Sequence, residues 1–223
     1  LIRLPFHQGN ILIDAAGSDT RELADDIILP VLQAQGITTL ELVIITHEDL
    51  DHCGSLSRIQ EMIPVKQVID QKQTEPISFG NFTFHFLLSE RMFDDPNENS
   101  ILTYIDLFGT SFLFMGDAGK TAEQTLMLAY PNLHADVLKI GHHGSNSATS
   151  LPFLQQLHPT LALISCGAHN RYGHPHEEPL KALAQMEVPW LDTPHYGAVS
   201  IKISNIFCIY ETASHEFGII KTR

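Results

Sequence analysis

The 223-residue sequence has few basic side chains, few cysteines and no long apolar run. Lys and Arg number 13 against 26 Asp and Glu, and the resulting net charge of -13 excludes charge-driven binding of nucleic acid over the whole surface. The three cysteines, Cys53, Cys166 and Cys208, are an odd and widely spaced set, which argues against a disulfide framework or a zinc finger. The longest apolar runs, such as 161–164, are too short to cross a membrane.

A signal peptide is also missing from the start of the chain, which has no charged segment before an apolar stretch and no Met at position 1. Leu1–Pro5 instead has the pattern of the middle of a strand. With 43% hydrophobic residues the sequence is typical of a folded protein. We therefore expect residues 1–223 to form one domain of a longer protein, with its first strand truncated.

Histidine, by contrast, is abundant. The 13 His residues equal Lys and Arg together, and several lie beside Asp. Imidazole and carboxylate groups are common metal ligands, so this composition indicates a metal site before any motif is considered.

The chain mixes hairpin patterns with β-helix-β patterns. A helix is expected from about residue 20 to 35, kinked or split by Pro30. Further helices are expected at 55–62, 122–130, 150–157 and 177–186. Strands are expected at 40–46, 65–70, 135–140 and 161–165, and hairpins at 1–14, 77–88, 101–115 and 199–210. This order predicts one α/β domain with mixed sheets.

The strongest chemical signal is the hexapeptide His47-Glu48-Asp49-Leu50-Asp51-His52, between an apolar strand and a helix. One short segment cannot easily point four ligands at a single ion. It can share them between two adjacent ions, with His47 and Asp49 on one and Asp51 and His52 on the other. The alternative is a polar strand-to-helix loop in which Asp51 is a helix cap.

Three later strands also end in Asp or His. Asp117 follows the strand that ends at Met115, His142 and His143 follow Val137–Ile140, and residues 170–176 follow the strand at 161–165. The ends of such strands are common sites of function in α/β proteins. Four strands that deliver ligands at one end predict a metal centre.

These motifs together resemble the metallo-β-lactamase fold and, within it, the carboxyl-terminal domain of the ComEC family of competence proteins, which form a DNA-uptake channel. Asp14, Asn99-Ser100 and residues 135–139 also fit that pattern, whereas the family's preceding Gly-Gln-Gly-Asp strand is absent. The resemblance implies an αββα sandwich of two mixed β-sheets flanked by helices.

The same resemblance implies a ligand set of His47, Asp49, Asp51, His52 and Asp117, with Asp117 bridging two ions. One of His142 and His143 takes the late ligand position, because adjacent side chains cannot both be assumed to bind, and His143 is favoured.

Two departures from the family pattern affect the choice of metal. Position 49 holds Asp where His is usual, and the usual His before the bridging acid is missing, so Asn97 or Asn99 is expected in its place. Fewer imidazoles make the site richer in oxygen, which favours manganese, with zinc and magnesium as alternatives. We predict two divalent ions.

The candidate catalytic residues are Asp51, Asp117 and His174. His174 is predicted to bind phosphate or act as a general acid, although a structural Gly-His-Pro turn is the alternative. Arg171, Ser145 and His176 are candidate substrate-binding residues, with a surface salt bridge as the alternative for Arg171.

The resemblance implies a metal-dependent nuclease that degrades the DNA strand that is not transported during uptake. The alternatives are a phosphodiesterase for a small or cell-envelope ester and a non-catalytic channel module with a relic metal site. We expect the domain to lie at the outer face of a membrane protein, to be soluble and monomeric alone, to bind DNA weakly, and to rely on the rest of the channel for further DNA contacts.

Overall fold

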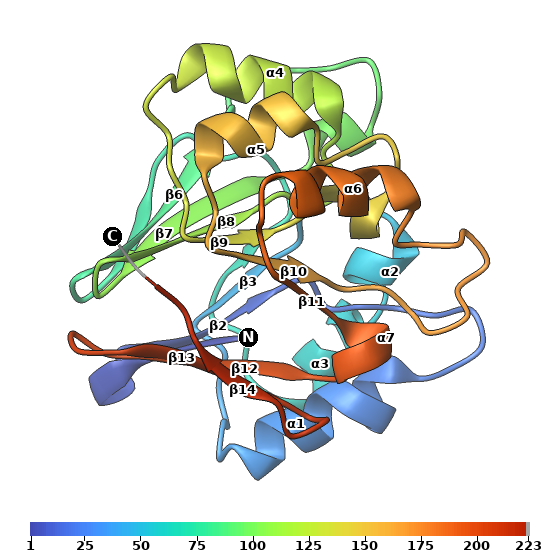
Figure 1. Cartoon of the computed structure of the whole chain (residues 1–223). Helices are drawn as coiled ribbons and strands as arrows, with labels where there is room; N and C mark the ends of the chain where they lie inside the picture. Colours follow the sequence, from blue (N-terminus) through green and yellow to red (C-terminus); the bar gives the residue numbers. More distant parts are fainter. Residues whose placement is uncertain (222–223) are drawn as a thin grey trace.

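Two mixed β-sheets face each other, and helices cover the outer side of each (Figure 1). The computed structural model describes residues 1–221. The smaller sheet has the order β1-β2-β3-β4. Its strands are β1 (Ile2–Leu4), β2 (Gly9–Ile13), β3 (Leu42–Ile44) and β4 (Val68–Ile69). β1 and β2 form the predicted hairpin, and β2, β3 and β4 run parallel.

The larger sheet has seven strands in the order β11-β10-β9-β8-β7-β6-β5. They are β5 (Ile77–Phe79), β6 (Phe82–Leu87), β7 (Leu102–Leu107), β8 (Thr110–Phe114), β9 (Val137–Lys139), β10 (Leu161–Ile164) and β11 (Trp190–Asp192). The strands from β8 to β11 are parallel. A separate antiparallel sheet contains β12 (Val199–Ile203), β13 (Cys208–Thr212) and β14 (Phe217–Ile219).

The helices α4, α5 and α6 cover the larger sheet, whereas α1 and α3 lie on the other side of the sandwich (Figure 1). The α-helices are α1 (Leu29–Ala34), α2 (Leu50–Cys53), α3 (Leu56–Met62), α4 (Lys120–Ala129), α5 (Leu151–Leu157), α6 (Glu177–Gln185) and α7 (Thr193–Tyr196). A π-helical turn, η2 (Ala24–Ile28), precedes α1, and short 3-10 turns occur at η1 (Pro5–His7), η3 (Asn97–Asn99) and η4 (Gly141–Gly144).

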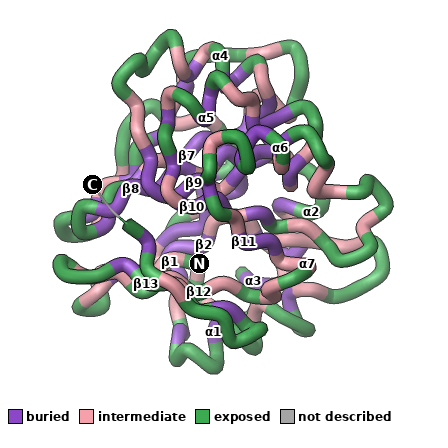
Figure 2. Tube along the Cα trace, viewed as in Figure 1, coloured by how far each residue is buried: buried purple, intermediate pink, exposed green. Residues whose placement is uncertain are grey.

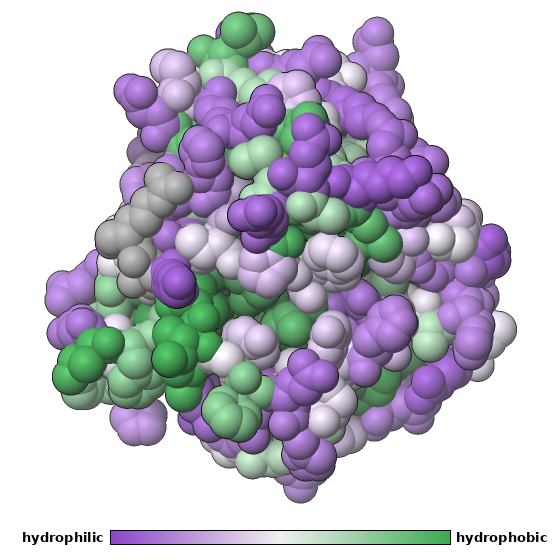
Figure 3. Space-filling model, in the orientation of Figure 1, coloured by the Kyte–Doolittle hydropathy of each residue, from purple (hydrophilic) through white to green (hydrophobic). Residues whose placement is uncertain are grey.

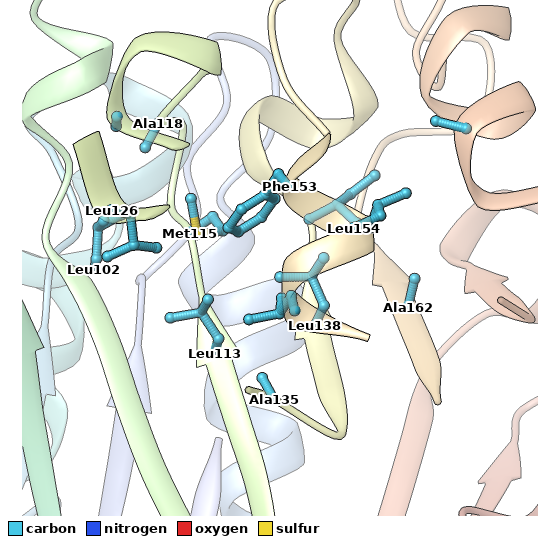
Figure 4. Packing of buried hydrophobic residues seen from close by; sticks show 14 of the residues in the cluster. Leu102, Leu113, Met115, Ala118, Leu126, Ala135, Leu138, Phe153, Leu154 and Ala162 are labelled. Atoms are coloured by element: carbon cyan, nitrogen blue, oxygen red, sulfur yellow. The ribbon is translucent and has the colours of Figure 1, made fainter. Parts of the chain in front are cut away.

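Three apolar clusters hold these layers together. One packs α4, α5 and α6 onto the larger sheet, with Phe153 and Leu113 fully buried in it (Figure 4). A second lies between the sheets, and a third packs α1 and α3 onto the smaller sheet. The buried segments follow the strands through the centre of the molecule (Figure 2). Successive side chains of a strand point to opposite faces of the sheet, so buried and exposed residues alternate. In β6, for example, Phe84 is buried and His85 is exposed.

The predicted α/β class and the two mixed sheets between helices are confirmed. The stretch at 20–35 divides into η2 and α1 with Pro30 in the first turn of α1, where its missing N–H costs nothing, so of the two predicted effects of Pro30 the structure shows the split. The sequence patterns also missed α2, α7, β11 and β14, which have only three or four residues each. No helix within residues 1–221 is both long and apolar enough to cross a membrane.

Candidate metal centre

The centre is built where parallel strands end. β2, β3, β8 and β9 are followed by Asp14, Thr46-His47, Asp117 and His142, respectively. Because β8 and β9 are parallel neighbours in one sheet, as β2 and β3 are in the other, their carboxyl ends lie at the same edge of the sandwich.

Asp117 is the middle of the site and is only 4% exposed. Its backbone N–H donates to Ser100 Oγ at 3.0 Å, which fixes the turn after β8. Oδ1 lies 3.2 Å from His52 Nε2 and 3.4 Å from His143 Nε2. Oδ2 lies 3.7 Å from His142 Nε2 and 3.8 Å from His47 Nε2. Each carboxylate oxygen therefore faces its own pair of imidazoles.

Two exposed carboxylates complete the two groups. Asp49 Oδ2 lies 3.4 Å from His47 Nε2, on the Oδ2 side of Asp117. Asp51 Oδ2 lies 3.3 Å from His143 Nε2, on the Oδ1 side. Potential ligand atoms of His47, His52 and Asp117, and of Asp51, His52 and His143, lie within 4.8 Å of one another in each set. The fold thus brings together all seven predicted ligands, and their roles in binding metal stay a prediction.

Unpaired polar atoms show that the site suits a cation. Both ring nitrogens of His47 are buried without a hydrogen-bond partner, which is costly unless another group binds them. Burial, together with the nearby His52, lowers the pKa of His47, so its imidazole is neutral and can act as a ligand. With Asp117 shared, each group offers two imidazoles and two carboxylates, a donor set that divalent metals accept.

Three of the four imidazoles are oriented by a polar contact of their Nδ1 atom, on the side of the ring away from Asp117. His52 Nδ1 donates to Asp14 Oδ2 at 2.9 Å, and His143 Nδ1 donates to the carbonyl of Ser165 at 2.7 Å. His142 Nδ1 lies 3.2 Å from Ser147 Oγ. Nε2 of each ring is thereby left facing Asp117, the arrangement that supports histidine ligands in metal proteins.

The ionisation of the site reflects its concentrated negative charge. Burial opposes protonation of His52, but its hydrogen bonds to Asp117 and Asp14 outweigh burial and raise its pKa to about 10. Burial would raise the pKa of Asp117, yet the hydrogen bond with His52 and the neighbouring histidines hold it far below its usual range. The hydrogen bond with His143 also lowers the pKa of Asp51. A positive charge is therefore stabilised here.

The expectation that one of the two adjacent histidines is the late ligand stays a prediction, but both of them reach Asp117. His142 and His143 have φ values of 46° and 53°, and Gly144 continues the left-handed segment at 84°. This unusual backbone turns the two imidazoles toward different oxygens of Asp117. His142 is the second imidazole, beside His47, that faces Oδ2 of Asp117.

The expectation that an Asn replaces the missing His is not supported for Asn99. Its side-chain amide donates to the carbonyl of Phe93 at 2.7 Å, and its Oδ1 accepts from the Phe93 N–H at 2.9 Å. These bonds close the preceding loop and occupy the amide. No hydrogen bond of the Asn97 side chain links it to the centre among the described residues.

His174 lies beside the centre, with its ring 5.8 Å from that of His142 and 6.4 Å from that of His143. Its Nδ1 donates to the carbonyl of His142 at 3.1 Å, so Nε2 is the acceptor in the neutral ring. Burial and the neighbouring histidines lower the pKa of His174. A proton on Nε2, which both predicted roles require, therefore depends on a negative charge from a substrate.

The three predicted substrate-binding residues differ in their surroundings. His176 accepts from the Asn146 N–H at 3.1 Å and donates to the Tyr172 carbonyl at 3.0 Å, so neither ring nitrogen is free for a substrate. Its predicted role is not supported, because these bonds hold two loops together. Ser145 Oγ accepts from Ser147 Oγ at 3.0 Å, behind His142. Arg171 is exposed and lies over the ring of Tyr172, 4.7 Å from its centroid.

Sequence patterns did not reveal the supporting roles of Asp14, Ser147 and the Ser165 carbonyl. Asp14 could have been found from the sequence, because it is an acid that directly follows an apolar strand. That strand, β2, runs parallel to β3 in the structure. Its carboxylate also accepts from Thr46 Oγ1 at 2.9 Å. Ser147 and the Ser165 carbonyl carry no such signal, because their partners come from the folded arrangement of separate loops.

Comparison with known proteins agrees with this geometry. A family model described as the metallo-beta-lactamase superfamily matches residues 1–80. The YhfI protein of Bacillus subtilis, a metallo-beta-lactamase fold protein of known crystal structure, aligns with 83% of this chain and 84% of its own, with a TM-score of 0.53 and 13% identity. This chain belongs to the metallo-β-lactamase superfamily.

Within this superfamily the chain is related to competence proteins of the ComEC family. It is 31% identical to ComE operon protein 3 of Bacillus subtilis over 90% of the chain and 31% of that protein. It is 30% identical to Recombination protein 2 of Haemophilus influenzae over 90% of the chain and 27% of that protein. The chain therefore spans about a third of the length of these relatives.

Proposed function

We propose that this chain is a metal-dependent phosphodiesterase that hydrolyses DNA. The observation that carries the proposal is the division of Asp117, whose two oxygens face separate groups of imidazole and carboxylate ligands. Two divalent ions at such groups supply Lewis-acid charge at phosphorus and lower the pKa of water. Of the candidate metals, manganese stays favoured, although His142 restores one of the two missing imidazoles.

The residues of the chain then have separate tasks. Asp117 would hold both ions, and Asp14 and the Ser165 carbonyl orient His52 and His143 so that their Nε2 atoms could bind them. His174 Nε2 takes up a proton when phosphate lies beside it and returns that proton to the leaving oxygen. Arg171 is placed on the exposed side, where it can contact a neighbouring phosphate.

In its biological setting, the domain degrades the DNA strand that is not transported during competence. The similarity to competence proteins supports this role. The domain is then part of a larger membrane protein and lies on its extracytoplasmic face. Because the chain carries a net charge of -13, the remaining parts of that protein supply most of the contacts with DNA, and the isolated chain is monomeric and binds DNA weakly.

A second candidate is a phosphodiesterase for a small ester such as a phosphocholine ester. Tyr172 favours it, since this exposed ring lies 5.7 Å from the ring of His174 and can cover a small substrate. Tyr196 does not contribute, because it packs against the apolar cluster between the sheets. The third candidate is a non-catalytic module that retains the ligands.

One assay separates the three. The protein is incubated with labelled single- and double-stranded DNA and with bis-p-nitrophenyl phosphate, in EDTA and with manganese, zinc or magnesium. We expect DNA cleavage with manganese, reduced about 100-fold or more in Asp51→Ala. Asp106→Asn is the control, since Asp106 lies at the β7–β8 turn, at the opposite end of β8 from Asp117.

The other outcomes are equally informative. Hydrolysis of the small ester alone selects the second candidate, and no hydrolysis by a folded, metal-loaded protein selects the third. Full activity with tightly bound stoichiometric zinc contradicts the manganese preference.

A further inference from the structure

Tyr172 is an exposed aromatic residue at the rim of the metal centre, with 61% of its surface open to solvent. Its ring lies 5.7 Å from the ring of His174, which in turn lies 5.8 Å from the ring of His142, a candidate ligand. The segment between β10 and α6, which carries Tyr172, projects at the right edge of the molecule in Figure 1. A planar aromatic ring is therefore accessible to a ligand one imidazole away from the centre.

The backbone around Tyr172 is fixed by side chains of its own loop. Asn170 Oδ1 accepts from the His174 N–H at 2.9 Å, and Asn170 Nδ2 donates to the His174 carbonyl at 2.6 Å. His176 Nε2 donates to the carbonyl of Tyr172 at 3.0 Å. His176 Nδ1 accepts from the N–H of Asn146, in the segment that follows the two adjacent histidines of the centre. The ring is thus carried by a closed loop that is tied to the centre, so little conformational entropy is lost when a ligand binds to it.

Arg171 covers one side of the Tyr172 ring. Its guanidinium lies 4.7 Å from the ring centroid and also donates to the hydroxyl of Tyr172. No ion pair within residues 1–221 includes Arg171, so its charge is available to a phosphate. The same charge would repel a quaternary ammonium group placed on this ring, whereas a neutral base would not be repelled.

The surface around this loop does not have the composition of a protein-docking patch. Figure 3 shows mostly hydrophilic residues at the right edge, whereas apolar residues gather at the lower left, over β12–β14, where Phe217 and Ile219 are exposed. A protein interface normally has a cluster of apolar side chains at its core. A single exposed aromatic ring beside an arginine is instead typical of sites on which single-stranded nucleic acid stacks its bases.

We propose that Tyr172 is a stacking platform for an unpaired base, and that the substrate of the centre is therefore a single strand of nucleic acid. The base lies on the open side of the ring, Arg171 contacts a phosphate of the same strand, and a neighbouring phosphate reaches the centre past His174. In a duplex both faces of each internal base are already stacked, so only an unpaired base can bind in this way. Stacking releases no counterions, so a chain with a net charge of -13 gains affinity without many phosphate contacts.

The inference rests on the proposed function, because it takes DNA as the ligand, but its test measures binding. A protein that binds the strand without cleaving it would therefore contradict the proposed function alone. Fluorescence anisotropy in calcium compares a labelled strand of about eight thymidines with an abasic strand that has the same number of phosphates. We expect the thymidine strand to bind about tenfold or more tightly. A covalently closed circular duplex, which has no terminal bases, is expected to compete no better per phosphate than the abasic strand.

Variants of Tyr172 assign the effect to its ring. The ratio of the two affinities is the readout, because a loss of fold or of the Arg171 contact weakens both strands alike. Tyr172→Phe keeps an aromatic face and is expected to retain the ratio, whereas in Tyr172→Leu the ratio is expected to fall to about one. Tyr130→Leu is the matched control, since this partly exposed tyrosine follows α4 at the end of the helix away from Asp117.

Three results would overturn the proposal. The first is equal binding of the thymidine and abasic strands by the unaltered protein, or no measurable binding of either. The second is a ratio of affinities that Tyr172→Leu leaves unchanged, which would place the base elsewhere. The third is a circular duplex that competes as well per phosphate as the thymidine strand, which would show that no unpaired base is needed.

Discussion

At the scale of single residues, Asp117 and its four histidines account for the chemistry of the site. A carboxylate that bridged two ions would need each oxygen directed at a different group of side chains, and the distances show such a division. Three of the four imidazoles are directed at it by contacts of their Nδ1 atoms with Asp14, the Ser165 carbonyl and Ser147.

Asp14 should control metal affinity without being a ligand. In Asp14→Asn the side chain keeps its size but loses the charge that orients His52 Nδ1. We expect the affinity for manganese to fall about 10- to 100-fold, with the fold retained. Titration with a competing chelator measures this, and Asp106→Asn should bind manganese as the unaltered protein does. Unchanged affinity in Asp14→Asn would show that His52 needs no support.

His52 should make the stability of the metal-free protein depend on pH. Its hydrogen bonds to Asp117 and Asp14 overcome burial and raise its pKa from 6.5 to about 10 in the folded state. The folded protein therefore holds this proton more tightly than the unfolded chain does. The resulting stabilisation is fully present below pH 6.5 and is lost as the pH rises through about 10.

Urea unfolding in EDTA should accordingly show the free energy of unfolding falling by a few kcal/mol over that pH range. The fall should be smaller in Asp14→Asn, which lacks one of the two carboxylates. A free energy of unfolding that rises with pH over this range would contradict the proposed ionisation of His52.

At the scale of elements, the turns after the strands decide where the ligands lie. The turn after β9 puts three successive residues in the left-handed region, and the turn after β8 begins with Gly116 at a φ of 55°. A Cβ at Gly116 would lie 2.8 Å from Ser100 Cβ and 2.9 Å from Thr46 Cβ. These neighbours support Asp117 and His52, so the turn and the centre share one packing arrangement.

Gly116→Ala is therefore expected to harm both stability and metal binding. The unfavourable φ and the two close contacts should reduce the free energy of unfolding by about 2 kcal/mol. Displacement of Ser100 and Thr46 should also weaken manganese binding. Gly109→Ala is the matched control, because Gly109 also has a positive φ but an added Cβ there meets nothing within 4 Å. Equal manganese affinity in the two variants would contradict the link between this turn and the centre.

At the scale of the whole molecule, the negative charge opposes the proposed substrate. A protein that contacts 6–10 phosphates loses about 10³- to 10⁵-fold in affinity for DNA between 50 and 200 mM salt. With 13 basic against 26 acidic side chains, the isolated chain can make few such contacts.

We therefore expect weak DNA binding with a shallow salt dependence, corresponding to about two phosphate contacts or fewer. Fluorescence anisotropy with labelled single-stranded DNA over this salt range measures the slope. If Arg171 contacts a phosphate, Arg171→Ala should reduce the slope by about one, whereas Arg58→Ala, which removes an arginine paired with Asp25, should not. A steep slope would show that the isolated domain binds DNA without the rest of a longer protein.

The sequence alone predicted the fold class, which is confirmed, and a set of candidate ligand residues, which the fold brings together. Apolar strands that end in Asp or His are a local pattern, and four of them along one chain are recognisable without coordinates. Short elements such as β11 and α7 were missed, since three or four residues carry too little periodicity to be distinguished from loops.

The sequence predicted how the side chains of residues 47–52 divide into two groups, and only the tertiary structure decided which group His142 and His143 join. That His142 and His143 face different oxygens depends on a left-handed backbone that their residue types do not favour, and that His176 joins two loops depends on partners distant in the chain.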